Sequence, residues 1–133
     1  MRVLGQKMTL GKALILLLCS LTGALVALSS PVHADECEQL GSMSAIRRCL
    51  IETTVAEMEE TYQLVLQNLL TDEARKALEA SQAAFIEYRY QSCTAVYEAS
   101  KQFGWVAEDY ATNCVTRLNR QRQELLLNTP NAG

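Results

Sequence analysis

The chain has 133 residues, of which 49% are hydrophobic and 20% are charged, and its formal net charge is −3. This length limits it to about one domain, and its acidic balance argues against a nucleic-acid-binding protein, because such proteins contact phosphates with clustered Lys and Arg. Only one histidine is present, so catalysis or metal binding based on histidine has little support.

The first 34 residues have the features of a secretory signal peptide. Lys7 and Lys12 precede an uncharged, Leu-rich run over residues 13–30, and small residues follow up to Ala34. A basic start, an apolar centre and an A-x-A-like site at residues 32–34 predict cleavage after Ala34. The alternative is retention as a membrane anchor, because about 18 uncharged residues could just span a bilayer.

Residues 35–133 form the predicted exported domain, periplasmic or secreted. Three of the 12 basic residues and none of the 15 acidic residues lie in residues 1–34, which leaves 9 basic and 15 acidic residues and a net charge of −6. His33, the one histidine, is removed as well. Without a histidine, a nucleophile beside a recognisable base or a metal-binding spacing, we expect no enzyme, no cofactor and no metal.

The apolar spacing predicts an all-α fold, a small antiparallel bundle of three long helices after a short N-terminal segment. Residues 44–70 lack Pro and Gly, and apolar residues recur there every three or four positions. Thr71 predicts the N-cap of a second helix that runs to a turn at residues 101–104. A third helix is expected from Val106 to a point before Pro130.

Each predicted helix has one apolar face that we expect to be buried. The faces consist of Ile46, Leu50, Met58, Tyr62, Val65, Leu66 and Leu69; of Ala74, Leu78, Phe85, Tyr88 and Val96; and of Val106, Tyr110, Cys114, Leu118 and Leu125.

Four cysteines in a small exported domain predict two disulfides, because an oxidising compartment keeps them closed. The midpoint between Cys93 and Cys114 falls on the predicted turn at residues 103 and 104, so both lie at the same height of an antiparallel helix pair. This geometry favours the pair Cys93–Cys114 and leaves Cys37 to pair with Cys49.

Two stretches, LEASQAAFIEYRYQSC at residues 78–93 and CVTRLNRQRQELL at residues 114–126, resemble the LprI-like lysozyme-inhibitor domain, an exported bacterial family. The matching positions are Tyr62, Leu66, Gln82, Tyr88, Arg89, Arg122 and the four cysteines. The departures are Ser81, Phe85, Tyr90 and Asn119, where the family usually has Ala, Trp, Asp and Thr. Phe85 keeps a large apolar side chain, whereas Tyr90 removes a charge beside Arg89.

The resemblance implies that the protein binds and inhibits a lysozyme or a related peptidoglycan-cleaving enzyme. Lysozymes are commonly basic and use two carboxylates in a cleft, so an acidic domain would be attracted to them. The candidate contact residues are acidic residues of the first helix, acidic residues after the turn, and the turn itself. They are Glu52, Glu57, Glu59 and Glu60; Glu108 and Asp109; and Phe103, Gly104 and Trp105.

Several alternatives remain open. The acidic residues can be ordinary solvated helix faces, and Trp105 can pack the turn against the first helix. Gln82 and Arg89 can contact a partner, but we expect them, with Phe85, Tyr88 and Arg122, to serve the helix interface, where buried polar groups need partners. The whole domain can also be a structural or adaptor module of the cell envelope.

Overall fold

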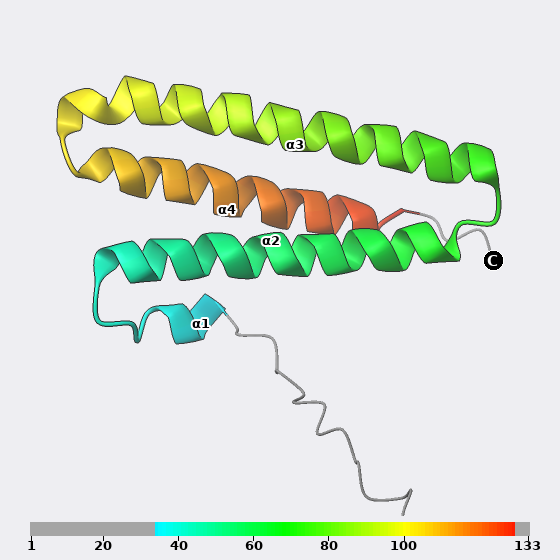
Figure 1. Cartoon of the computed structure of the whole chain (residues 1–133), viewed down its shortest axis with the longest axis horizontal. Helices are drawn as coiled ribbons and strands as arrows, with labels where there is room; N and C mark the ends of the chain where they lie inside the picture. The colour runs from blue at the N-terminus through cyan, green and yellow to red at the C-terminus, as the bar shows by residue number, and fades with distance from the viewer. Residues whose placement is uncertain (1–33, 130–133) are drawn as a thin grey trace, which may run out of the picture. The chain divides into compact units, whose positions relative to one another are not determined.

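The computed structural model describes residues 34–129 (Figure 1). These residues contain α1 (Ala34–Cys37), α2 (Met43–Asn68), α3 (Asp72–Ser100), a 3-10 turn η1 (Lys101–Phe103) and α4 (Val106–Leu127), and they contain no strand. The predicted all-α class, with three long helices after a short N-terminal segment, is confirmed. The predicted signal peptide lies outside the described residues except for Ala34, and its removal stays a prediction.

Local chemistry explains where the long helices begin. The Ser42 hydroxyl accepts a hydrogen bond from the backbone N–H of Ala45 at 3.2 Å, and the Thr71 hydroxyl accepts one from Ala74 at 3.2 Å. Both residues are N-caps, which satisfy backbone donors that the first helical turn leaves free. Gly104 follows η1 with a φ of 71°, a conformation that favours glycine, and the chain then reverses into α4.

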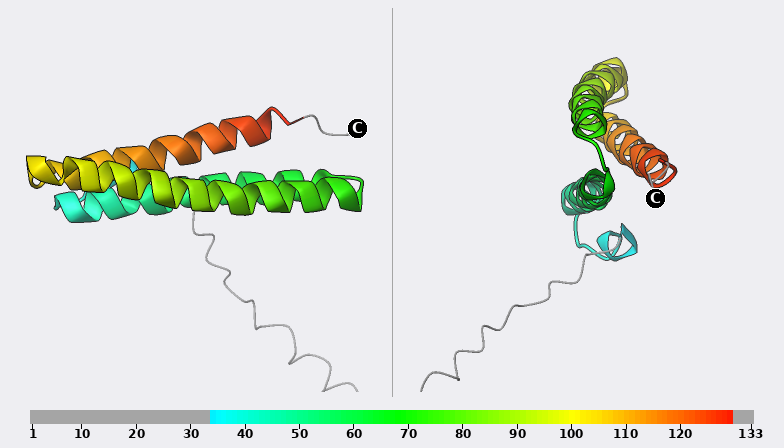
Figure 2. Two further views of the ribbon diagram at one scale, coloured as in Figure 1. Left: turned by 90° about the horizontal axis from the view of Figure 1, so that it is seen from above. Right: turned by 90° about the vertical axis from the view of Figure 1, so that its right-hand side faces the viewer.

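Helix α4 is the central helix of the bundle. It contacts both α2 and α3, whereas α2 and α3 make few direct contacts with each other. Seen end-on, α4 lies to one side of the other two long helices (Figure 2). Helices α2 and α3 are therefore two walls, and α4 is the floor between them.

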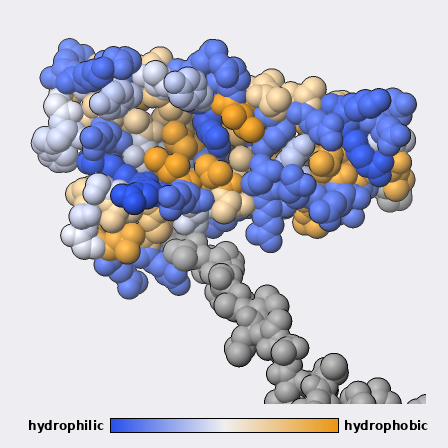
Figure 3. Space-filling view, in the orientation of Figure 1, coloured by the Kyte–Doolittle hydropathy of each residue, from blue (hydrophilic) through white to orange (hydrophobic). Residues whose placement is uncertain are grey.

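The side that faces the viewer in Figure 1 is the open side of this arrangement, because α4 lies behind α2 and α3 in that view. Hydrophobic side chains gather in the middle of this face, among hydrophilic ones (Figure 3). This face is therefore more apolar than the charge of the chain suggests.

The buried interior combines a small apolar cluster with many polar side chains. Tyr62, Val65 and Leu126 form the cluster, and Leu66 and Leu78 pack against it. The buried polar residues are Thr53, Thr54, Thr61, Gln82, Ser100, Thr112, Thr116, Asn119 and Arg122. Hydroxyls at positions 54, 61 and 112 each donate to the backbone carbonyl four residues earlier, at 2.8–2.9 Å, so burial leaves them paired.

Three residues of the predicted buried faces are exposed, and that part of the prediction is wrong. Tyr88, Tyr110 and Leu125 are 58%, 50% and 61% exposed. On α4 the buried face carries polar residues such as Thr112 and Asn119 instead. Cys114 of the predicted α4 face is buried and Val106 and Leu118 are half-buried, so the apolar spacing identified this face only in part.

Both predicted disulfides are present. Cys93–Cys114 joins α3 to α4 with a Cα–Cα distance of 5.5 Å, and Cys37–Cys49 joins α1 to α2 with a Cα–Cα distance of 5.6 Å. The first bond joins the two helices of the α3–α4 hairpin about ten residues from its turn. The second bond cross-links α1 to α2, in addition to the backbone between them.

Replacing both Cys93 and Cys114 by Ala should lower the free energy of unfolding by about 3 kcal/mol, because the bond closes a loop of 21 residues in the unfolded chain. Urea unfolding followed by circular dichroism measures this loss. The double Ala variant at Cys37 and Cys49 is the matched control, since it opens a loop of 12 residues and leaves the α3–α4 hairpin closed. An unchanged free energy of unfolding in the first variant would contradict the prediction.

Candidate functional site

A groove with acidic walls lies beside the turn between α1 and α2. Its volume is about 470 Å³, and it is lined by Leu40, Ala45, Arg48, Cys49, Glu52, Thr53, Ala56, Glu57 and Glu60. Three carboxylates and a single guanidinium surround apolar carbon atoms, so negative charge dominates. We call this feature the acidic groove.

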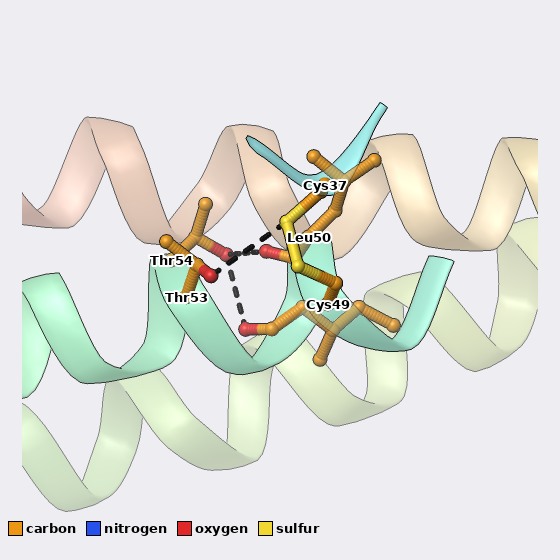
Figure 4. Close-up of a disulfide and its surroundings, with 6 residues drawn as sticks. Cys37, Cys49, Leu50, Thr53 and Thr54 are labelled. Carbon is orange, nitrogen blue, oxygen red and sulfur yellow. Dashed lines mark hydrogen bonds between the residues drawn. A yellow bond between two sulfur atoms is a disulfide. The ribbon is translucent and has the colours of Figure 1, made fainter. Parts of the chain in front are cut away.

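The Cys37–Cys49 disulfide supports the acidic groove, which Cys49 lines. Cys37 is completely buried, and its Sγ lies 3.8 Å from the Thr53 hydroxyl (Figure 4). Thr54 donates to the carbonyl oxygen of Leu50 at 2.9 Å in the same turn of α2. The wall formed by Leu40 therefore depends on a covalent link and on close packing of α1 against α2.

The structure divides the acidic residues that the sequence groups into one patch. Glu57 and Glu60 line the acidic groove together with Glu52. Glu59 does not line it: one carboxylate oxygen accepts from Gln63 at 2.9 Å and the other accepts from Gln82 at 3.5 Å. Glu59 is thus engaged with α3, while the other three carboxylates face the groove.

Glu108 and Asp109, the second predicted acidic patch, form ion pairs with Arg47 of α2. Arg47 Nε donates to Asp109 Oδ1 at 2.7 Å, and Arg47 Nη1 pairs with the Glu108 carboxylate. The hydrogen bond that Arg47 donates to Asp109 is the largest of the effects that raise the pKa of Arg47. These contacts tie the start of α4 to the start of α2, and the Glu108 side chain stays more than half exposed.

The hairpin tip extends into solvent. Phe103 is 59% exposed and Trp105 is 74% exposed, so the alternative in which Trp105 packs the turn against the first helix is wrong. The tip, α1 and the start of α2 share one end of the bundle (Figure 1). We call this the turn end and define it by the exposed apolar residues Leu40, Met43, Phe103 and Trp105.

Phe85 lies between two guanidinium groups. The Arg89 and Arg122 carbons are 5.6 and 5.5 Å from the centre of its ring, distances at which a cation is attracted to the π system. Arg122 also donates to the side-chain oxygens of Gln82 and Ser81, each at 3.1 Å. These residues form a buried polar network between α3 and α4. Tyr88, the remaining motif residue, lies outside it and is exposed.

Asn119 connects all three long helices. It is completely buried, its Nδ2 donates to the Thr54 hydroxyl of α2 at 3.2 Å, and its Oδ1 accepts from Arg89 Nη1 of α3 at 2.5 Å. In the sequence, Asn119 stands out only as a departure from the family pattern, which usually has Thr at this position. The available signal was the three-or-four spacing of the polar positions 112, 116, 119 and 122, which marks one face of α4.

Burial shifts the ionisation of the groups around Phe85. Desolvation lowers the pKa of Arg89 and of Arg122. Desolvation, followed by the charges of Glu79 and Glu59, raises the pKa of Tyr62. The tyrosine therefore holds its proton more tightly in the folded protein than in the unfolded chain.

Residues 34–129 show neither a cluster of metal-binding side chains nor a membrane-spanning helix. No three His, Cys, Asp or Glu side chains in this part of the chain are grouped so as to hold a metal ion. None of the helices described here is both long enough and apolar enough to cross a membrane.

Replacing Asn119 by Ala should destabilise the fold by about 1–3 kcal/mol, because Arg89 loses the acceptor of its hydrogen bond and Thr54 loses a donor. Chemical denaturation of the purified protein measures the change. Asn113, on the same helix but exposed, is the matched control, and its Ala variant should stay within about 0.5 kcal/mol of the original chain. Equal effects at both positions would contradict the role of Asn119.

Stability should fall at alkaline pH in a manner that depends on Tyr62. The raised pKa means that protonated Tyr62 contributes to the free energy of unfolding. This stabilising contribution is complete below pH 10, where the unfolded chain also keeps the proton, and it is lost as pH rises through the pKa of the folded state. Urea unfolding at a series of pH values between about 9 and 11 should show a steeper decline for the original chain than for Tyr62→Phe. Parallel declines would refute this.

One of three comparisons with known proteins gives a match. The sequence profile described as "Lysozyme inhibitor LprI" matches residues 34–126, which include α1, α2, α3 and nearly all of α4, with both disulfides. No curated protein and no solved structure matches the chain. Because the profile match spans well over half of the chain, the protein belongs to the LprI lysozyme-inhibitor family.

Proposed function

We propose that the protein is exported and inhibits a basic lysozyme, or a related peptidoglycan-cleaving enzyme, by binding it at the turn end. The observation that carries this proposal is the acidic groove, in which Glu52, Glu57 and Glu60 surround an apolar floor. Family membership supports the class of target. The two disulfides support export, since such bonds persist in oxidising compartments.

Opposite charges bring the two proteins together. A basic enzyme is attracted by the carboxylates of the acidic groove, which raises the rate of association and weakens as salt screens the charges. The apolar floor then contributes contact area that salt does not screen. Charge supplies orientation in this scheme, and apolar contact supplies most of the affinity.

The hairpin tip lies at the turn end, where the acidic groove begins beside Leu40 before it continues along α2 to Glu60. Phe103 and Trp105 are exposed aromatic side chains on a turn that the Cys93–Cys114 bond and the Arg47–Asp109 ion pair hold in place. A rigid projection loses little conformational entropy on binding, and aromatic residues are frequent anchors of interfaces. This shape suits insertion into a substrate cleft, which would block access to the catalytic carboxylates.

Replacing Glu52, Glu57 and Glu60 by Gln together should weaken binding to a basic lysozyme by about tenfold at low salt, because three surface charges are lost. The difference should shrink as salt rises toward about 0.5 M, where charge interactions are screened. Calorimetric titration measures the affinity, and the rate at which a cell-wall suspension clears measures the inhibition.

The matched control replaces Glu73, Glu79 and Glu124 by Gln, which changes the net charge equally at exposed positions outside the acidic groove. Replacing Phe103 and Trp105 by Ser tests the tip at constant net charge. An equal loss of lysozyme affinity in both triple variants would mean that only the net charge of the protein matters. A protein with no effect on any lysozyme at micromolar concentration would favour the alternative of an adaptor in the cell envelope.

A further inference from the structure

A second groove lies on the open side of the bundle, between the two walls. Its volume is about 390 Å³, and it is lined by Ile51, Val55, Ile86, Glu87, Arg89, Tyr90 and Val115. We call it the α2–α3 trough. It shares no lining residue with the acidic groove, and a volume of this size is typical of sites for small ligands.

Most of the lining of the trough is apolar. Ile51 and Val55 come from α2, Ile86 comes from α3, and Val115 comes from the floor helix α4. The trough therefore offers branched aliphatic side chains from three helices to one occupant.

Arg89 places a positive charge in this apolar lining. Among the described residues its side chain makes one hydrogen bond, from Nη1 to Asn119 Oδ1, and the guanidinium also lies over the ring of Phe85. A guanidinium has five N–H donors, and among the described residues no carboxylate approaches that of Arg89 within ion-pair distance. No buried side-chain nitrogen in this part of the chain lacks a partner, so the remaining donors of Arg89 reach solvent.

The surroundings of Arg89 do not supply a counter-charge. Arg122, which also lies over the ring of Phe85, adds a second positive charge and donates to neutral oxygens. Glu87 is the one acidic residue of the trough, and its carboxylate accepts a hydrogen bond from Gln91 one turn further along α3. The interior of an acidic domain thus contains two guanidinium groups that lack a neutralising carboxylate within ion-pair distance.

We infer that the α2–α3 trough binds a small molecule in which a carboxylate is joined to an aliphatic group. The carboxylate would accept hydrogen bonds from the free donors of Arg89, a pairing whose planar geometry allows two parallel bonds. The aliphatic part would lie on Ile51, Val55, Ile86 and Val115, and Tyr90 would cover it at the rim. A fatty acid and the carboxyl end of an aliphatic peptide both have this chemistry.

Calorimetric titration of the full chain with two probes tests the inference and separates the two sources. Octanoate represents the fatty acid, and acetyl-leucyl-valine with a free carboxylate represents the peptide end. At least one of them should bind saturably with a Kd on the order of 0.1–1 mM, a range suited to ligands of this size. The probe that binds more tightly identifies the source.

Neutral analogues isolate the contribution of the charge. Octanamide and the amide of the same dipeptide should bind about tenfold more weakly than the acids, because a hydrogen bond to a charged group is lost. Arg89→Gln should weaken binding of the acids by about the same factor and leave binding of the amides unchanged. Arg117→Gln, at an exposed position of α4 outside the trough, is the matched control with the same change in net charge.

A second variant guards against a folding defect in Arg89→Gln. Ile86 is 43% exposed, so Ile86→Glu should fold, as circular dichroism can verify, while it places a negative charge in the trough. It should abolish binding of the acids, whereas Glu87→Gln should leave binding intact or tighten it. Any of three results would overturn the inference. Neither acid binds saturably up to about 10 mM, or acid and amide bind equally tightly, or Ile86→Glu binds the acids as tightly as the original chain does. Inhibition of lysozyme is measured separately, so either proposal can fail without the other.

Discussion

One buried amide sets the relation between the three long helices. Asn119 of α4 bonds to Thr54 of α2 and to Arg89 of α3, and it is fully excluded from solvent. Since a buried polar group without a partner is costly, the helices are held where both bonds can form. The apolar cluster of Tyr62, Val65 and Leu126 adds hydrophobic burial, but it is small and does not by itself specify this arrangement.

This polar interface explains why the bundle has open faces. Helix α4 uses compact polar side chains such as Thr112, Thr116 and Asn119 against its neighbours, and α2 and α3 both pack on it. The two outer helices make few contacts with each other, so a trough remains between them. On the opposite side of α2, the short helix α1 and its disulfide shape the acidic groove. Both open surfaces therefore follow from two long helices packed on one central helix, with the short helix α1 packed on α2.

The two surfaces have opposite electrostatic character. The acidic groove presents Glu52, Glu57 and Glu60 to solvent and suits a basic protein. The trough presents Arg89 within aliphatic side chains and suits a small carboxylate. The net charge of the chain describes neither surface, because it sums charges that the fold places on different faces. The proposed enzyme site and the proposed ligand site therefore use different residues of the chain.

The sequence by itself determined the local features: the all-α class, the N-cap at Thr71, the turn at Gly104 and the disulfide pairing, because each depends on neighbours along one helix or one hairpin. It did not reveal that Arg47 pairs with Asp109, that Glu59 turns away from Glu57, or that Trp105 stays exposed. These outcomes depend on how each helix is rotated about its own axis. Apolar spacing could not predict that rotation for α4, since Tyr110 and Leu125 are exposed and Asn119 is buried. Only the tertiary structure decided it, because a polar face is buried when partners on other helices satisfy its hydrogen bonds.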